Sequence, residues 1–199
     1  MTPSTLWTLD SLSRIGGHTP QVLGAPRLVA GPGGPAVAFD GQRDGLVIDC
    51  HPLAGADRFT IEMVFRPESG GEREQRVLHL QEAGSDSRLL IETRAPAEDY
   101  WFVDTFARSG DVSCTLYAEA HPHPFGPWYH VALVYDGRTM RHYVSGVLEL
   151  SGQLAFAPQR SGQTSLGVRL NRVSWFRGLV RAVGFTPLDL GPEAFQLRA

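Results

Sequence analysis

The chain has 199 residues, with 18 basic and 21 acidic side chains, a net charge of −3 and an isoelectric point of about 6.1. All the basic residues are arginine, which excludes mechanisms that need a lysine, such as Schiff-base formation and the phosphate-binding loop. The slightly acidic balance argues against a nucleic-acid partner, which usually requires a basic surface. The length suits one domain with its own hydrophobic core.

Glycine and proline are unusually frequent, with 22 and 14 residues, above average usages of about 7% and 5%. This excess predicts many turns. Residues 1–20 lack a basic head followed by an apolar run, so no secretory signal is expected. No run reaches the roughly 18 apolar residues of a membrane span. We therefore expect a cytoplasmic protein without a membrane partner, in which Cys50 and Cys114 are reduced.

Short strands between turns account for most of the chain in sequence order. Residues 1–36 are expected to hold one or two edge strands and loops. Further strands are predicted at 37–39, 46–48, 59–65, 76–81, 88–94, 101–107, 128–135, 140–144, 166–170 and 179–185. Asp-Gly pairs at 40–41, 44–45 and 136–137 mark turns, and residues 192–197 are the one helical candidate. The pattern predicts a single all-β domain over residues 1–199, a sandwich or jelly roll.

Motifs of the common enzyme classes do not fit this chain. The GxSxG, HExxH and CxxC patterns are absent, which disfavours serine hydrolases, zincins and zinc ribbons. Gly31-x-Gly33-x-x-Ala36 matches a dinucleotide fingerprint, but Pro32 and Pro35 remove amide donors and no helix follows. We expect that segment to be a loop.

Four segments resemble bacterial laminin-G-like domains of the concanavalin A-like superfamily. They are Phe39-Asp40-Gly41 with Asp44 and Val47, Phe59-Thr60-Ile61-Glu62 with Arg66-Pro67, Trp128 to Gly146, and Phe176-Arg177-Gly178, followed by a tail that ends near Phe195. They occur in the order found in the family and span residues 37–195. The resemblance implies an all-β, two-sheet antiparallel jelly-roll sandwich with one concave sheet.

The resemblance also bears on packing and on metals. It implies that Trp128 is a core residue. Calcium-binding members often carry an acidic residue after the penultimate strand, where this chain has Arg181 and Ala182. Asp40 and Asp44 remain weak calcium candidates, and the preferred interpretation is that both make turns. No cofactor is expected beyond that possible calcium ion.

Polar side chains interrupt several of the predicted strands and share faces by the two-residue period. A sheet covered on both sides would not tolerate them unpaired, because each unpaired group costs roughly 1–3 kcal/mol. We therefore predict a polar groove on the concave sheet, the alternative being an ordinary solvated face. The candidate ligand-binding residues are Gln81, Glu92, Arg94, Asp104, Arg169 and Asn171, with Trp101 as an aromatic surface for a sugar ring.

These residues point first to a lectin-like domain that binds a saccharide or similar polar ligand. The rival hypothesis is a carbohydrate-active enzyme, a polysaccharide lyase or a hydrolase, with His79, His142 and Tyr143 as catalytic candidates. A hydrolase of the superfamily's retaining glucanase type is disfavoured, because the ExDxxE spacing is missing. A protein-interaction module is the third possibility, since laminin-G-like domains often bind proteins.

Overall fold

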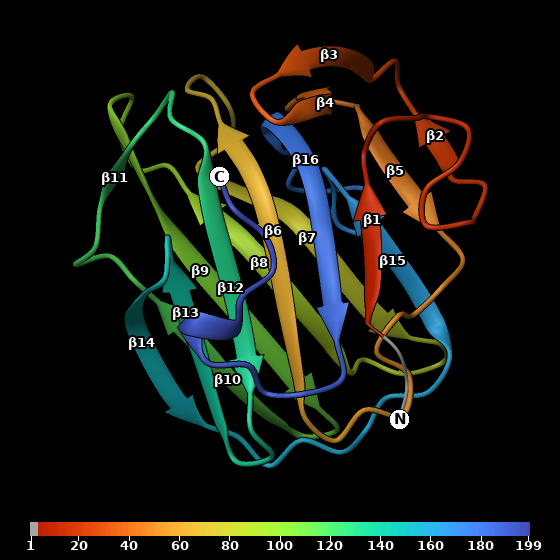
Figure 1. Cartoon of the computed structure of the whole chain (residues 1–199), viewed down its shortest axis with the longest axis vertical. Coiled ribbons are helices and arrows are strands. Elements are labelled where there is room, and N and C mark those ends of the chain that lie inside the picture. Colours follow the sequence, from red (N-terminus) through yellow and green to blue (C-terminus); the bar gives the residue numbers. More distant parts are fainter. Residues whose placement is uncertain (1–3) are drawn as a thin grey trace.

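β-branched and aromatic residues fill the strands of this chain, and glycines with positive φ occupy many of its turns. The computed structural model describes residues 4–199, which form two antiparallel sheets packed face to face (Figure 1). The front sheet comprises β1 (Thr5–Thr8), β3 (Arg27–Gly31), β4 (Gly34–Asp40), β6 (Phe59–Pro67), β12 (Tyr129–Tyr135), β13 (Thr139–Val144), β14 (Val147–Gln153) and β16 (Arg177–Thr186).

The back sheet comprises β2 (Gln21–Leu23), β5 (Gly45–Ile48), β7 (Glu74–Glu82), β8 (Arg88–Arg94), β9 (Tyr100–Ser109), β10 (Val112–Tyr117), β11 (His123–Pro124) and β15 (Gly162–Leu166). Its strand order is β10-β9-β8-β7-β15-β5-β2, and β11 pairs with β9. The front sheet has the order β14-β13-β12-β6-β16-β4-β3, and β1 pairs with β16. Together the sheets form the jelly-roll sandwich that the sequence predicts.

The inner faces of both sheets meet in one hydrophobic core. Trp101 lies in it fully buried, with its ring edge-on to Phe65 and Tyr129 at centroid distances of 5.6 and 5.0 Å. Trp128 does not. It is half-buried, and the guanidinium groups of Arg66 and Arg181 lie 5.9 and 5.6 Å from its ring, so the expected core role for Trp128 is wrong.

One predicted strand, residues 166–170, differs from the structure where it matters for the outer surface. Strand β15 ends at Leu166, because Gly167 has φ of +77° and turns the chain out of the sheet. Residues 167–175 form a loop, here called the crossing loop. It returns to β7 where the backbone carbonyl of Ser174 accepts a hydrogen bond from the Arg76 N–H. The helical candidate at 192–197 is a single 3-10 turn, η1 (Pro192–Ala194).

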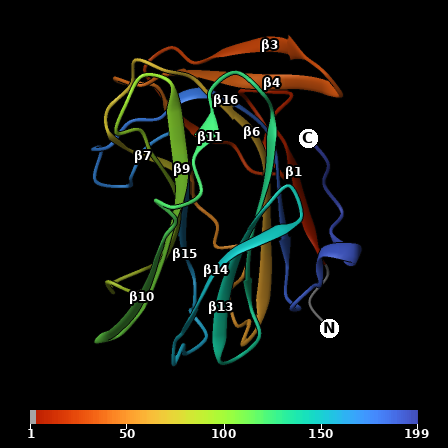
Figure 2. The ribbon, with the colours of Figure 1, turned by 90° about the vertical axis from the view of Figure 1, so that its left-hand side faces the viewer.

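The outer faces of the two sheets differ in how they are covered. The C-terminal segment crosses the front sheet (Figure 1), where Phe195 is buried and the backbone N–H groups of Gln196 and Leu197 donate to Glu62. In Figure 2 the lower end of the back sheet, at β10, swings away from the front sheet. Within residues 4–199, no helix is long and apolar enough to cross a membrane.

Candidate functional site

Strand alternation turns a set of polar side chains outward from the back sheet. Leu78, Leu80 and Ile91 point into the core, so His79, Gln81, Leu90 and Glu92 point the other way. A bulge between Arg76 and Leu78 places Val77 in the core as well. The antiparallel register then places these outward residues in rows across the strands. One row joins Asp104, Glu92 and Arg76; the next joins Phe106, Leu90 and His79; a third joins Arg108, Arg88, Gln81 and Gln163.

A small depression, here called the charged cleft, opens where these rows meet the crossing loop. Its volume is about 150 Å³, and it is lined by Arg76, Arg88, Leu90, Glu92, Arg94, Asp104, Phe106, Thr115 and Arg169. Its charged side chains are largely removed from water, since Glu92 and Asp104 are 2% and 1% exposed. Buried charges persist in proteins only when they are paired.

An ion-pair network supplies that pairing. Arg94 donates from Nε to Asp104 Oδ2 at 2.8 Å, and its Nη2 lies 2.6 Å from the same oxygen and 3.4 Å from Glu92 Oε2. Arg76 pairs with Glu92 and, at 2.5 Å, with Glu74. Glu74 also pairs with Arg94, so two guanidiniums and three carboxyl groups form one network on the sheet surface.

The network leaves some of its buried atoms without a hydrogen-bond partner. Arg76 Nη1 is an unpaired donor and Asp104 Oδ1 an unpaired acceptor. Burial, together with the nearby Asp104 carboxylate, raises the pKa of Glu92 to about 8, although the adjacent arginines act against this rise. The cleft therefore offers both donor and acceptor positions to a ligand.

The crossing loop separates this cleft from a second depression. Its Leu170 N–H donates to His79 Nδ1 at 3.1 Å, which ties the loop to the outer face of β7. Burial, followed by the positive charges of Arg169, Arg88 and Arg76, lowers the pKa of His79 to about 3. His79 is therefore neutral near pH 7 and serves as an acceptor for the loop.

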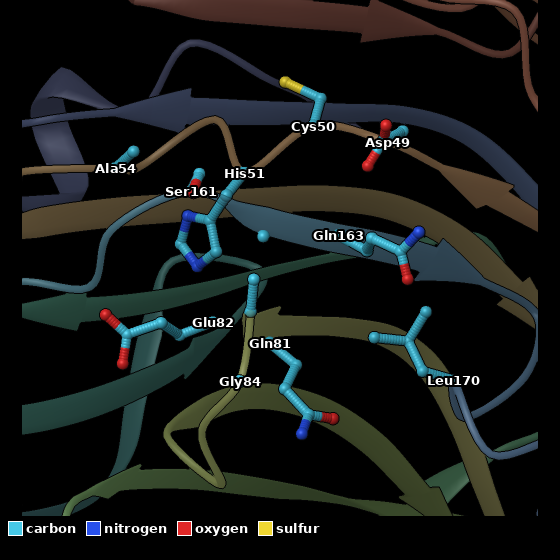
Figure 3. Close-up of a pocket in the computed structure, with 12 residues that line it drawn as sticks. Asp49, Cys50, His51, Ala54, Gln81, Glu82, Gly84, Ser161, Gln163 and Leu170 are labelled. Carbon is cyan, nitrogen blue, oxygen red and sulfur yellow. The ribbon is translucent and has the colours of Figure 1, made fainter.

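The second depression, here called the amide pocket, has a volume of about 740 Å³, which is in the range of small-molecule sites. Figure 3 shows the His51 ring and the Gln81 and Gln163 side chains around it. His51 Nε2 lies 2.7 Å from Gln159 Oε1, and its Nδ1 is buried without a partner. The remaining lining residues are Asp49, Cys50, Ala54, Glu82, Ala83, Gly84, Ser161, Gly162 and Leu170.

The residues predicted to bind ligand fall into four places. Glu92, Arg94, Asp104 and Arg169 come together in the charged cleft, and Gln81 lines the amide pocket. Asn171 is exposed on the crossing loop and lines neither depression. Trp101 lies in the core between the sheets, so it has no ring face to offer a ligand on this surface.

The three catalytic candidates of the enzyme hypothesis lie in three different layers. His79 is on the outer face of the back sheet. His142 lies between the sheets, where its Nδ1 is 2.9 Å from Thr105 Oγ1. Tyr143 packs against Phe195 on the outer face of the front sheet. The sequence hypothesis placed them in one site. The sandwich separates His79 from the other two because β7 and β13 belong to different sheets, and it separates His142 from Tyr143 because these neighbours on β13 point to opposite faces.

The two calcium candidates both accept hydrogen bonds from backbone N–H groups, and Asp40 does so within its own turn. Asp40 Oδ1 accepts hydrogen bonds from the N–H groups of Gln42, Arg43 and Asp44, and Asp44 Oδ1 accepts one from Ala25. Burial opposes ionisation of Asp40, but these N–H groups and Arg43 outweigh it and lower its pKa. Among the residues described, no three His, Cys, Asp or Glu side chains are grouped to hold a metal ion. Cys50 and Cys114 are both free thiols.

Several residues of these depressions carried no clear signal in the sequence. Arg76 marked only the start of a predicted strand, although a register opposite Glu92 would have assigned it to the cleft. His51 follows Cys50, and Gln163 lies in a polar Ser-Gly-Gln-Thr run. Neither of these segments resembles a known motif. Only the packing of residues 49–54 against β7 and β15 brings them together.

The comparisons with known proteins agree on the fold. The sequence profile of the concanavalin A-like lectin/glucanases superfamily, Laminin_G_3, matches residues 40–190. No curated protein sequence matches the chain. Among solved structures, domain 4 of AbnA, a GH43 extracellular arabinanase from Geobacillus stearothermophilus in complex with arabinotriose, is 18% identical with a TM-score of 0.72. The alignment covers 95% of this chain and 94% of that one.

Two further solved structures are similar over part of their length. The binding domain of botulinum neurotoxin serotype D/C is 9% identical with a TM-score of 0.67, and the alignment covers 96% of this chain and 50% of that one. The binding domain of Paraclostridial Mosquitocidal Protein 1 is 10% identical with a TM-score of 0.69, and the alignment covers 95% of this chain and 50% of that one. At these identities the similarity establishes the fold alone.

Proposed function

Since this chain belongs to the concanavalin A-like lectin/glucanases superfamily, we propose that it is a lectin-like domain that binds a saccharide. The binding surface is the outer face of the back sheet, from the amide pocket to the charged cleft. Folds of this kind carry unrelated activities, so the proposal rests on the surface itself. A neighbour with this fold is a domain of an arabinanase in complex with arabinotriose, which is consistent with the proposal.

One observation carries the proposal: a row of planar polar side chains links the two depressions. Gln163, Gln81 and Arg88 are direct register partners across β15, β7 and β8. Amide and guanidinium groups bind two neighbouring hydroxyls at once, which is the hydrogen-bonding pattern of a sugar ring. Unpaired atoms at both ends, His51 Nδ1 and Asp104 Oδ1, supply further positions.

The test is calorimetry against a panel of oligosaccharides, with Gln163→Ala as the variant. Gln163 is exposed in β15, so its removal should leave the melting temperature unchanged. Loss of two ligand hydrogen bonds, each about 0.5–1.5 kcal/mol, should weaken binding by about 5- to 150-fold. Gln42→Ala, an exposed glutamine in a distant turn, is the matched control. Absence of binding across the panel, or equal affinity of Gln163→Ala and Gln42→Ala, would overturn the proposal.

A carbohydrate-active enzyme is the second candidate, supported by the raised pKa of Glu92 beside a second carboxylate. Glu92 and Asp104 are direct register partners across β8 and β9, and Arg94 pairs with both. A retaining hydrolytic mechanism would require their carboxyl groups to lie about 5–5.5 Å apart on either side of a scissile bond. Release of reducing ends from the bound saccharide, abolished in Glu92→Gln, would support the enzyme; binding without product would support the lectin-like domain.

A further inference from the structure

The arginines on the outer face of the back sheet are of two kinds. Arg76 and Arg94 are paired with carboxylates in the network described above. Arg88, Arg108 and Arg169 have no carboxylate within ion-pair distance among residues 4–199. Arg88 and Arg108 donate only to the backbone carbonyls of nearby turns. Among the described residues this second group therefore adds positive charge that no ion pair neutralises, and the nearby carboxyl groups of Asp86 and Glu92 offset only part of it at Arg88.

These unpaired arginines are close to one another. Arg88 and Arg169 both line the charged cleft, and Arg108 is the register partner of Arg88 across β8 and β9. Burial, then the charges of Arg169 and Arg108, lower the pKa of Arg88. Like charges held together in a partly buried site oppose folding, and an anion bound between them would relieve that repulsion.

Unpaired buried donors lie in the same cleft. Arg88 Nε and Arg76 Nη1 are buried without a hydrogen-bond partner, and Arg76 is only 6% exposed. Buried guanidinium N–H groups are normally satisfied, and a bidentate carboxylate or sulfate is their best partner. The Arg88 guanidinium is also held in place, because it lies 4.8 Å from the centre of the Phe106 ring.

From this juxtaposition, and resting on the proposed saccharide function, we propose that the charged cleft selects an acidic saccharide. Arg88 and Arg169 bind its carboxylate or sulfate group, and Arg76 donates from Nη1. Asp104 Oδ1 accepts a hydrogen bond from a sugar hydroxyl, since an acceptor beside the arginines favours a ligand that carries both an anion and a hydroxyl. A neutral sugar of the same size leaves the guanidinium groups unpaired and binds less tightly.

The experiment compares matched ligands by calorimetry. Trigalacturonate is set against the galactotriose obtained by reducing its carboxyl groups, and a sulfated disaccharide against its unsulfated form. The acidic member of at least one pair should bind about tenfold tighter or more, and its affinity should fall as salt is raised. The pair that shows the preference identifies carboxylate or sulfate as the ligand group.

Arg88→Gln and Arg169→Gln should each weaken binding of the acidic ligand by a larger factor than binding of the neutral one, and so remove most of the preference. Arg172→Gln is the control, since Arg172 is exposed on the same crossing loop and lies outside the cleft. Arg169→Gln is the second reporter if Arg88→Gln lowers the melting temperature. Equal affinity for acidic and neutral ligands, or a preference unchanged in both variants, would overturn the inference and leave saccharide binding intact. Absence of binding to every sugar would instead remove the proposed function.

Discussion

Arg94→Ala is the variant that best tests how the charged cleft is held together. Asp104 is 1% exposed, and Arg94 binds it through both Nε and Nη2. Removing one partner of a buried ion pair costs about 3–5 kcal/mol, because a charge remains buried without compensation. That is a large part of a typical unfolding free energy of about 5–15 kcal/mol. In a chain of this length it should lower the melting temperature by roughly 6–20 °C.

The measurement is urea denaturation at pH 7, with Arg141→Ala as the control. Arg141 also forms an ion pair, with Asp136 at 2.7 Å, but both side chains are about a quarter to a third exposed (32% and 25%). An exposed pair of this kind contributes about 0–1 kcal/mol. Adding Asp104→Leu to Arg94→Ala should restore part of the lost stability, since the uncompensated charge is then removed. A loss in Arg94→Ala no larger than that in Arg141→Ala would refute the assignment of Arg94 as the centre of the network.

Three further predictions concern the same surface. The pKa of Glu92 is raised to about 8 in the folded protein, from about 4.5 in the unfolded chain, so its contribution to stability is complete below pH 4.5 and is lost as pH rises through 8. Glu92→Gln should flatten this fall in unfolding free energy between about pH 5 and 8, and an unchanged slope in the variant would contradict the prediction. The pKa of His79 is lowered to about 3, so its contribution is present above about 6.5 and is lost as pH falls toward 3; His79→Asn, which keeps an acceptor for Leu170, should remove this acid-side loss in denaturation curves recorded from pH 7 to 4. Gly167→Ala should destabilise the protein by about 1–3 kcal/mol, because φ is +77° and the added methyl would lie 2.4 Å from the Phe39 ring; a melting temperature equal to wild type would be inconsistent with the observed exit of the crossing loop.

Local sequence patterns predicted most of the strands. The alternation in residues 88–94 marks β8 with the bounds that the structure has, and the Asp-Gly pair at 136–137 marks the β12–β13 turn. Both signals depend on backbone preferences of a few adjacent residues, which do not need tertiary contacts. Strands β10 and β14 were not predicted, because their exposed edge positions interrupt any apolar run.

The candidate site was predictable only in part. Glu92, Arg94 and Asp104 stand on strands whose faces follow from alternation, so their meeting in one cleft could be anticipated. The expected place of Arg169 on a strand was wrong, because one positive φ at Gly167 takes the chain out of the sheet. Arg169 reaches the cleft by way of the crossing loop instead.

By itself, the sequence of this protein determined the strand content, the turns and the absence of lysine, which leaves arginine as the only strongly basic side chain. Tertiary structure decided which polar residues share a surface. His79, His142 and Tyr143 have similar strand contexts in the sequence. In the structure His79 lies on the outer face of the back sheet, His142 between the sheets, and Tyr143 on the outer face of the front sheet. The physical reason is that alternation along a strand assigns each side chain to one of the two faces of a sheet. Which of those faces packs in the core, lies under another segment of the chain or is exposed to solvent depends on the sheet that the strand joins and on the distant segments that cover it.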